Sequence, residues 1–229
     1  MLSVLKGSSL RRRLLSHKAA GTPMEAFYNA SWPKRATPLE HLEFIAVDLE
    51  TTGLSPNQHE IVSIGWCVIR GMTILYGDRG HVLCKPEKEV SEESAVIHTL
   101  TDDMLADAPP LCESLEAFLP HAAGRVLIAH HCKIETGFLD KACKKCFGLP
   151  FEMPTIDTMG LEIRTLMRRN EAVEPGMLRL DALRSRYNLP RYKSHNAMID
   201  AIAAGELFLA QAAHRSGKDG KIELRDVCV

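Results

Sequence analysis

The stretch Phe44-Ile-Ala-Val-Asp48-Leu-Glu50-Thr-Thr-Gly-Leu54 decides how this chain folds. Apolar side chains occupy every second position from Ile45 to Leu49, and this period predicts a β-strand. Side chains two positions apart in a strand point to the same face, so Asp48 and Glu50 project together, about 7 Å apart. Neighbouring carboxylates repel each other and raise each other's pKa. The pair therefore suits either a solvated strand face or a site for a hard divalent cation such as Mg²⁺.

The composition is ordinary for a soluble globular protein, with 45% hydrophobic and 25% charged residues. A length of 229 residues suits one domain, or one domain with an extension. No apolar run approaches the ~18–20 residues needed to span a membrane. The formal net charge of −1 argues against wide, salt-sensitive coverage of a nucleic-acid duplex. It does not exclude a nucleic-acid partner, because acids gathered in a metal site cancel basic residues elsewhere.

The seven cysteines are odd in number and irregularly spaced, and we recognise no signal peptide before them. We therefore expect reduced thiols and a cytoplasmic location. Cys143-Lys-Lys-Cys146 is a single CxxC without a second pair. Zinc or redox use is one interpretation, and two thiols one turn apart on a helix is the other, which we favour.

Residues 1–40 read as a basic helical extension followed by a linker. Basic residues such as Arg12 precede the first acid, Glu25, and leucines recur at helical spacing. A basic amphipathic helix that packs on the domain or contacts a partner is the favoured interpretation, and a mitochondrial transit peptide is the alternative. Pro33 and Pro38 oppose helix in the linker.

Residues 41–215 form the expected catalytic domain, and 216–229 form a tail. The patterns predict strands at 43–49, 61–69, 72–84, 125–129 and 155–158, and helices at 91–97, 101–106, 111–122, 133–147, from 158 to about 169, 177–187 and 197–214. The first three strands form an antiparallel meander. Alternating helices and strands then predict an α/β fold with a mixed sheet covered by helices. A late strand is expected in the tail, from Lys221 to Val229.

The second informative segment is Ala129-His-His-Cys-Lys-Ile-Glu135. A buried strand ends at Ala129 and a helix begins shortly after it, which places Glu135 in the first turn. A negative charge there is favoured by the helix dipole, so Glu135 is either a simple helix-start charge or a ligand. Asp140 is a competing acid, but it lies five residues on, a rotation of about 140° around the helix. Glu135 and Asp140 therefore cannot face the same site.

The third segment is Lys193-Ser-His195-Asn-Ala-Met-Ile-Asp200. Small apolar residues surround Asp200, and a carboxylate buried among them must be paired or metal-bound. His195 precedes the helix, with Ser194 as a candidate cap. An imidazole is a suitable base near neutral pH, although a histidine at a helix start can also be an ordinary surface residue.

These three segments, in this order and spacing, resemble the three motifs of the DEDDh 3′–5′ exonuclease superfamily. That group includes proofreading exonuclease subunits and oligoribonuclease-like enzymes. The resemblance extends from about Glu43 to His214 and includes Ala95-Val-Ile-His98-Thr-Leu-Thr and Ile156-Asp157-Thr158. It implies an RNase H-like fold with a mixed five-stranded sheet flanked by helices.

The resemblance also implies a two-metal mechanism with two Mg²⁺ or Mn²⁺ ions. The implied metal ligands are Asp48, Glu50, Glu135 and Asp200, and His195 is the implied general base. The implied substrate contacts are Thr51, Thr52, Leu54, His98 and His131. Two positions depart from the family: Glu135 replaces an Asp, and His131 replaces an Asn. The longer Glu135 side chain can reach an ion directly or shift the metal preference.

Three functions remain open on the sequence alone. The first is removal of 5′-mononucleotides from single-stranded DNA or RNA 3′ ends. The second is a phosphodiesterase for very short oligonucleotides or dinucleotides, which the near-neutral charge favours. The third is a non-catalytic binding module, against which the complete set of acids speaks. A homodimer or a polymerase-type partner is possible, and no membrane partner is expected.

Two further groups of residues invite interpretation as nucleic-acid contacts. Arg184, Arg186, Arg191 and Lys193 lie just before His195, where they either face phosphates or form a solvated basic helix end. Trp32 and Trp66 could stack on bases, although Trp66 lies in an apolar strand and fits the core better.

Overall fold

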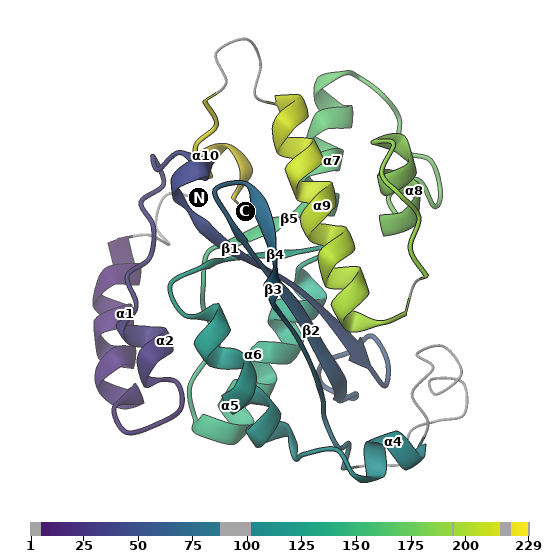
Figure 1. Ribbon diagram of the computed structural model, residues 1–229. Helices are drawn as coiled ribbons and strands as arrows, with labels where there is room; N and C mark the ends of the chain where they lie inside the picture. Colours follow the sequence, from purple (N-terminus) through teal and green to yellow (C-terminus); the bar gives the residue numbers. More distant parts are fainter. Residues whose placement is uncertain (1–5, 88–101, 194, 216–220, 229) are drawn as a thin grey trace.

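The computed structural model describes residues 6–87, 102–193, 195–215 and 221–228 (Figure 1). The helices are α1 (Lys6–Ala19), α2 (Glu25–Asn29), the 3₁₀ helix η1 (Leu39–His41), α4 (Asp102–Ala106), α5 (Leu111–Ala122), α6 (Lys133–Phe147), α7 (Thr158–Arg168), α8 (Leu180–Arg186), α9 (Ala197–Arg215) and α10 (Leu224–Val227). The strands are β1 (Glu43–Thr51), β2 (Ile61–Arg70), β3 (Thr73–Leu83), β4 (Val126–Ala129) and β5 (Thr155–Asp157).

The strands form one five-stranded mixed sheet in the order β3-β2-β1-β4-β5. β1 pairs antiparallel with β2, and β2 pairs antiparallel with β3, so the predicted meander is confirmed. β4 and β5 extend the sheet as parallel strands, with β4 next to β1. The first motif therefore lies on the central strand, and the chain after β4 leaves the sheet beside it.

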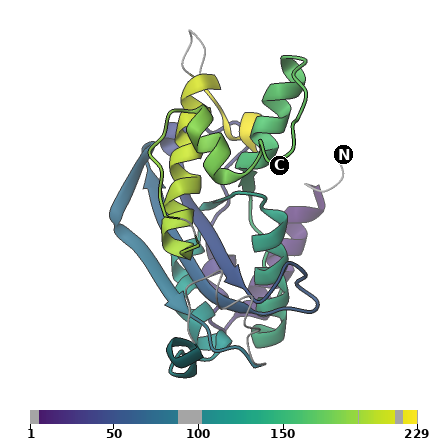
Figure 2. The same ribbon diagram turned by 90° about the vertical axis from the view of Figure 1, so that its right-hand side faces the viewer.

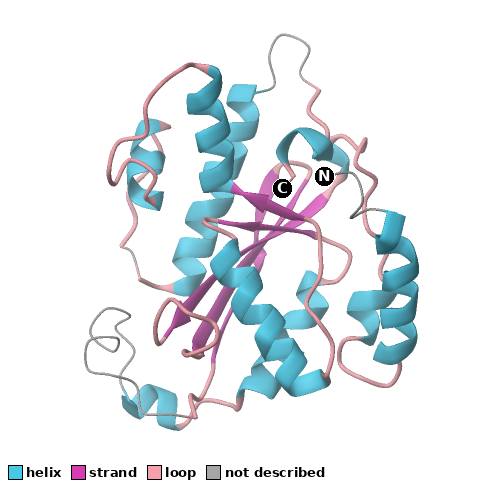
Figure 3. Cartoon of the chain, turned by 180° about the vertical axis from the view of Figure 1, so that it is seen from behind, coloured by secondary structure: helices cyan, strands magenta, loops and turns pink. Residues whose placement is uncertain are grey.

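Helices cover both faces of this sheet, as the two turned views make plain (Figures 2 and 3). The alternation of β1 sends Ile45 and Val47 into a core shared with α5 and α6. Phe44 and Ala46 point the other way, into a second core with Phe208 and other residues of α9. Because side chains alternate along a strand, Asp48 and Glu50 share the α9 face with Ala46.

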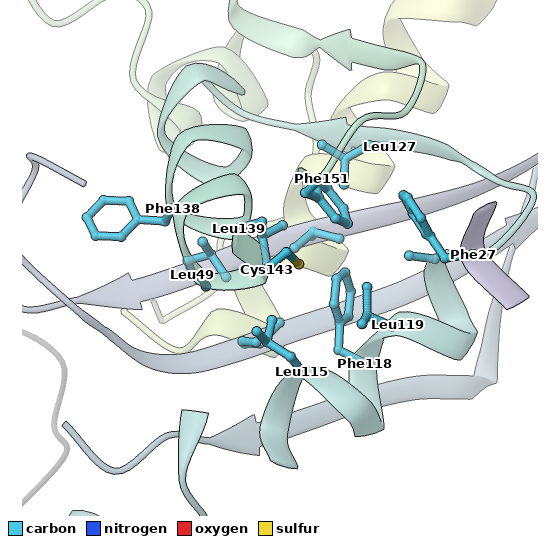
Figure 4. Packing of buried hydrophobic residues seen from close by; sticks show 14 of the residues in the cluster. Phe27, Leu49, Leu115, Phe118, Leu119, Leu127, Phe138, Leu139, Cys143 and Phe151 are labelled. Atoms are coloured by element: carbon cyan, nitrogen blue, oxygen red, sulfur yellow. The ribbon is translucent and has the colours of Figure 1, made fainter. Parts of the chain in front are cut away.

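Aromatic and aliphatic side chains fill the space between the sheet and the helices α5 and α6 (Figure 4). Phe118 is fully buried there, and Phe27 stacks on Phe151 with ring centroids 5.2 Å apart. Trp66 is only 4% exposed and packs its ring against Phe118. Trp66 is thus a core residue, as its strand position indicated, and its buried ring is not available to bases.

Helix α1 is fixed to the neighbouring α2 region by one arginine. The guanidinium of Arg12 lies 4.1 Å from the centre of the Trp32 ring and donates hydrogen bonds to the carbonyls of Phe27 and Ala30, at 2.7 and 2.8 Å. Phe27 belongs to the α5–α6 core, so these contacts tie the basic extension to the body of the protein.

In the described part of the tail the chain is helical over Leu224–Val227, so the late strand predicted from Lys221 to Val229 is wrong. Glu223 and Asp226 form a capping box that starts α10, and Leu224 and Val227 are buried beneath it. The capping box at the start of α10 and the burial of two side chains three residues apart favour a helix over the weak strand pattern. Elsewhere α8 begins at Leu180 instead of 177, and the predicted helix at 91–97 lies outside the described residues.

The expectation that the cysteines are reduced is wrong for one pair. Cys112 in α5 and Cys146 in α6 form a disulfide, with their Cα atoms 5.4 Å apart. The two helices pack side by side, which brings residues 34 positions apart within bonding distance. Cys143, the other half of the CxxC, is a buried free thiol, so the CxxC does not pair internally. None of the helices in the described ranges is long and apolar enough to cross a membrane.

Candidate active site

Two strands position the carboxylates of the first motif. In the register of β1 with β2, Asp48 lies opposite Gly65, and Glu50 lies opposite Ser63. Glu50 is only 6% exposed, while Asp48 is partly exposed. Both therefore sit at the end of the central strand, on the face that α9 covers.

Gly65 lets the first turn of α9 approach these carboxylates. A Cβ atom at this position would lie 2.1 Å from the backbone carbonyl carbon of Ala197, so no larger side chain fits. Farther along α9, Gly205 packs against the side chains of Ala46 and Ile69, where an added Cβ atom would be tight at 3.3 and 3.2 Å. The close approach brings Asp200 to β1, and carboxylate oxygens of Asp48, Glu50 and Asp200 lie within 4.8 Å of one another.

His195 lies directly before α9 and faces the same space. Its backbone is left-handed, with φ at +69°, and its N–H donates a 2.8 Å hydrogen bond to Oδ2 of Asp200. The side chain is exposed to solvent. This bond fixes the predicted base and the predicted third-motif acid relative to each other. Ser194, the candidate cap, lies outside the described residues.

Glu135 lies in the first turn of α6 and is only 4% exposed. Within the described part of the chain its Oε2 atom is buried and has no hydrogen-bond partner. Burial, together with the charge of Asp157, raises the pKa of Glu135 to about 8. Glu135 is not one of the three acids whose oxygens lie within 4.8 Å, but its charge acts on Asp48.

Burial and mutual repulsion make the charged forms of the acids in this site unfavourable when no cation is bound. Burial raises the pKa of Asp48 well above its usual range, and the charges of Glu135, Glu50 and Asp200 raise it further. Burial also raises the pKa of Asp200, although the N–H of His195 partly offsets this. A buried, unpartnered oxygen on Glu135 and three converging carboxylates fit hard divalent cations such as Mg²⁺ or Mn²⁺. Asp140, the competing acid, instead binds Lys144.

A cleft of about 660 Å³ opens beside the acids, between the sheet and α8. Its lining includes three of the predicted site residues, Asp48, His195 and Asp200. The opposite wall comes from α8 and the segment after it, including Ser185, Arg191 and Tyr192. The size is that of sites that hold small ligands, so the cleft has room for a short piece of a nucleotide chain.

The structure places most of the predicted substrate contacts near the first and second motifs. Thr51 is buried and its hydroxyl donates to the carbonyl of Gly53, which closes the turn after β1. Thr52 bonds Glu60 through its backbone N–H, and Leu54 is 78% exposed. These residues are thus an ordered turn with one apolar side chain presented to solvent. His98 lies outside the described residues.

The second motif contributes two histidines with different surroundings. His131 is exposed and left-handed, with φ at +68°, and its N–H donates to Oδ1 of Asp157. His130 is tied on both sides: Nε2 lies 2.8 Å from the carbonyl of Leu178, and Nδ1 lies 2.9 Å from the hydroxyl of Thr158. Since a carbonyl only accepts, Nε2 must be the donor. His130 therefore anchors the segment leading into α8, a role that its sequence position did not reveal.

The basic residues before His195 have separate roles. Arg184 is 4% exposed and forms a 2.8 Å ion pair with Glu206. Arg186 pairs with Glu171 at 2.7 Å. Arg191 lines the cleft, and Lys193 is exposed outside it. The sequence could not separate these roles, because all four lie within ten residues.

Fold and site together define a nuclease domain, and comparison with known proteins agrees. The model of the family described as Exonuclease matches residues 45–208, so the chain belongs to this exonuclease family. It carries a DEDDh-type 3′–5′ exonuclease domain, as the three motifs predicted.

Within the family, bacterial polymerase proteins are among the relatives. The chain is 30% identical over 185 residues to DNA polymerase III subunit epsilon of Treponema pallidum, covering 79% of this chain and 81% of that protein. It is 34% identical over 166 residues to a DNA polymerase III PolC-type of Thermotoga maritima, covering 72% of this chain. The matched region spans only 12% of that PolC-type protein.

Solved structures support the fold. The nuclease domain of 3′hExo, a DEDDh family member bound to rAMP, superposes with a TM-score of 0.65 at 14% identity. The match covers 78% of this chain and 96% of that domain. Exonuclease X in complex with 5′ overhanging duplex DNA gives 0.56 at 23% identity, over 81% of this chain and 98% of the other. The predicted RNase H-like fold is confirmed.

Proposed function

We propose that this protein is a divalent-metal-dependent 3′–5′ exonuclease that removes 5′-mononucleotides from single-stranded DNA or RNA. The observation that carries the proposal is the convergence of the Asp48, Glu50 and Asp200 carboxylates beside a cleft that Asp48, Asp200 and His195 line. Family membership supports the reaction type.

The four acids fit the metal ions of this reaction. Asp48, Glu50 and Asp200 would hold one Mg²⁺ or Mn²⁺, and Asp48 with Glu135 a second. When bound, the two ions supply charge stabilisation for the attacking and leaving oxygens of an in-line displacement. The buried Oε2 of Glu135 supports its role as a ligand, because a buried carboxylate oxygen without a partner is costly.

The protein's own contribution to the chemistry centres on His195. Its imidazole takes a proton from the water that attacks phosphorus, while its backbone N–H holds Asp200. The bond between phosphorus and the 3′ oxygen breaks, that oxygen takes up a proton from solvent, and the His195 imidazolium returns its own proton to solvent. The products are a 5′-mononucleotide and a strand shortened by one residue. Thr51, Thr52, Leu54, His98 and His131 are the proposed contacts to the terminal nucleotide.

A 5′-labelled oligonucleotide tests this reaction directly. With Mg²⁺ or Mn²⁺ we expect a ladder that shortens from the 3′ end, and no ladder with EDTA. His195→Ala should lower kcat by about 10²–10⁴-fold, the usual contribution of a general base, and Asp48→Ala should abolish turnover. His41→Ala is the matched control, because His41 is exposed on η1. Full activity in His195→Ala or Asp48→Ala would reject the mechanism.

A restriction to very short oligonucleotides is the second candidate, favoured by the net charge of −1. A substrate with few phosphates needs few cationic contacts. A length series from dinucleotides upward, as DNA and as RNA, separates the two candidates. Preference for two-residue substrates would support the second, and rates that rise with length would support the first. Absence of turnover on every length would support the non-catalytic binding module.

The binding partners and the cellular location of the protein are also proposals. The similarity to an epsilon subunit supports a polymerase-type partner, and a homodimer is the other arrangement predicted from the sequence. The cytoplasmic location inferred from reduced cysteines has lost part of its support, because Cys112 and Cys146 are disulfide-bonded.

A further inference from the structure

Arg191 lies at the wall of the cleft, between two residues that are fastened to the body of the protein. It lies in the segment between α8 and α9, is exposed, and lines the cleft together with Asp48, His195 and Asp200. A cationic side chain that lines a cleft is a candidate anion site, and the contacts of its two chain neighbours hold the backbone from which it extends.

Both neighbours of Arg191 are fastened to α9. The buried guanidinium of Arg184 donates 2.8 Å hydrogen bonds to the carbonyls of Pro190 and Ala203. The same guanidinium lies 4.5 Å from the centre of the Tyr192 ring, and the Tyr192 hydroxyl donates to Glu206 at 2.9 Å. The backbone on each side of Arg191 is therefore ordered before any ligand arrives, which lowers the entropic cost of binding.

Arg191 itself remains available. Among the residues that the structure describes, no carboxylate forms an ion pair with it, whereas Arg184 and Arg186 are both paired. Arginine presents a planar fork of donors that matches phosphate oxygens. The chemistry of the position thus favours a phosphate group in the cleft.

The polarity of the reaction determines which phosphate this can be. A nucleotide chain cut one residue from its 3′ end has no phosphate beyond the scissile one on the 3′ side. All other phosphates lie on the 5′ side. We propose that Arg191 binds the first phosphate on the 5′ side of the scissile phosphate, a specificity contact that rests on the proposed exonuclease function. The cleft, about 660 Å³ and also lined by Asp48 and Asp200, has the size for this short reach.

Two dinucleotides that differ only in a 5′-phosphate isolate this contact. The unphosphorylated one carries the scissile phosphate alone, and the phosphorylated one adds the proposed partner of Arg191. The wild-type protein should prefer the phosphorylated dinucleotide in kcat/KM. Arg191→Gln should lower this preference at least tenfold, mostly through KM, because the charge-assisted hydrogen bond to the phosphate is lost. Arg168→Gln, an exposed arginine in the last turn of α7 that does not line the cleft, should retain the preference.

The outcomes separate this inference from the proposed function. A wild-type protein that shows no preference, or a preference that survives Arg191→Gln, overturns the phosphate contact alone. An equal loss on both dinucleotides also overturns it, because Arg191 would then act on the scissile phosphate or on the fold. A wild-type protein that cleaves no oligonucleotide of any length with Mg²⁺ or Mn²⁺ contradicts the exonuclease function, and the contact falls with it.

Discussion

Glu135 is the most deeply buried of the four candidate metal ligands. Its carboxylate is buried at the start of α6, and one oxygen has no partner within the described residues. Helix-start charges are usually exposed, so burial separates Glu135 from the simple helix-dipole interpretation that the sequence left open. What remains is a group that either binds a cation or carries a proton.

The pH dependence of stability follows from this burial. The pKa of Glu135 is raised to about 8, against 4.5 for an ordinary glutamate. Between these values the folded state keeps a proton that the unfolded state has lost, so the metal-free protein loses stability as pH rises, and the loss is complete above about pH 8. The raised pKa values of Asp48 and Asp200 act in the same direction. Thermal unfolding in EDTA from pH 5 to 9 measures this slope.

Glu135→Gln should flatten that slope and stabilise the metal-free protein at pH 8.5 by a few kcal/mol. Glu113→Gln is the control, because Glu113 is a first-turn glutamate of α5 that is exposed to solvent. Equal slopes in the wild-type protein and Glu135→Gln would show that Glu135 does not carry the extra proton.

Among the elements, the position of α9 decides whether a site exists at all. α9 carries Asp200 and packs against β1 and β2 through small residues, with its first turn on Gly65. The three-acid cluster depends on this approach, because Asp200 reaches Asp48 only when the helix lies directly on the strand. Gly65 thus contributes to the site only by allowing α9 to lie close to the sheet, and not by binding a ligand.

Gly65→Ala tests the approach of α9. The added methyl would lie 2.1 Å from the backbone of Ala197, so the helix must shift. We expect a loss of about 1–3 kcal/mol in the free energy of unfolding, as for overpacked cores, and a loss of activity that is larger than the stability loss explains. Gly77→Ala is the control, since a Cβ there meets no atom within 4 Å. Unchanged activity in a folded Gly65→Ala protein would mean that the helix position is not critical.

At the scale of the whole molecule, local patterns predicted most of the elements. The limits of α5 and α6 follow from apolar periodicity, and Gly148, left-handed with φ at +67°, ends α6 as a helix C-terminal glycine does. The three motifs predicted Asp48, Glu50 and Asp200 as neighbours, and the structure brings these acids together. Motif spacing and family resemblance were sufficient to predict these three neighbours, because each residue lies near the end of a regular strand or helix.

What the sequence did not predict depends on contacts between distant segments. The Cys112–Cys146 disulfide joins residues 34 positions apart, and no spacing rule marks that pair. The tail became a helix because Leu224 and Val227 bury against the second core. The contacts around His130 and Arg191 come from other segments of the chain, so the sequence alone did not predict them. Gly65 alone carried a usable signal, since glycine inside a strand often marks a close backbone approach.

The central claim is that acids from three separate elements form one metal site, and calorimetric titration of Mn²⁺ tests it most directly. We predict that the metal-free wild-type protein binds two Mn²⁺ ions and that Asp200→Asn loses one of them or binds it at least tenfold more weakly. Glu40→Gln, a change at an exposed acid of η1, should bind as the wild-type protein does. Equal Mn²⁺ binding by Asp200→Asn and the wild-type protein, or no binding by the wild-type protein, would contradict the account.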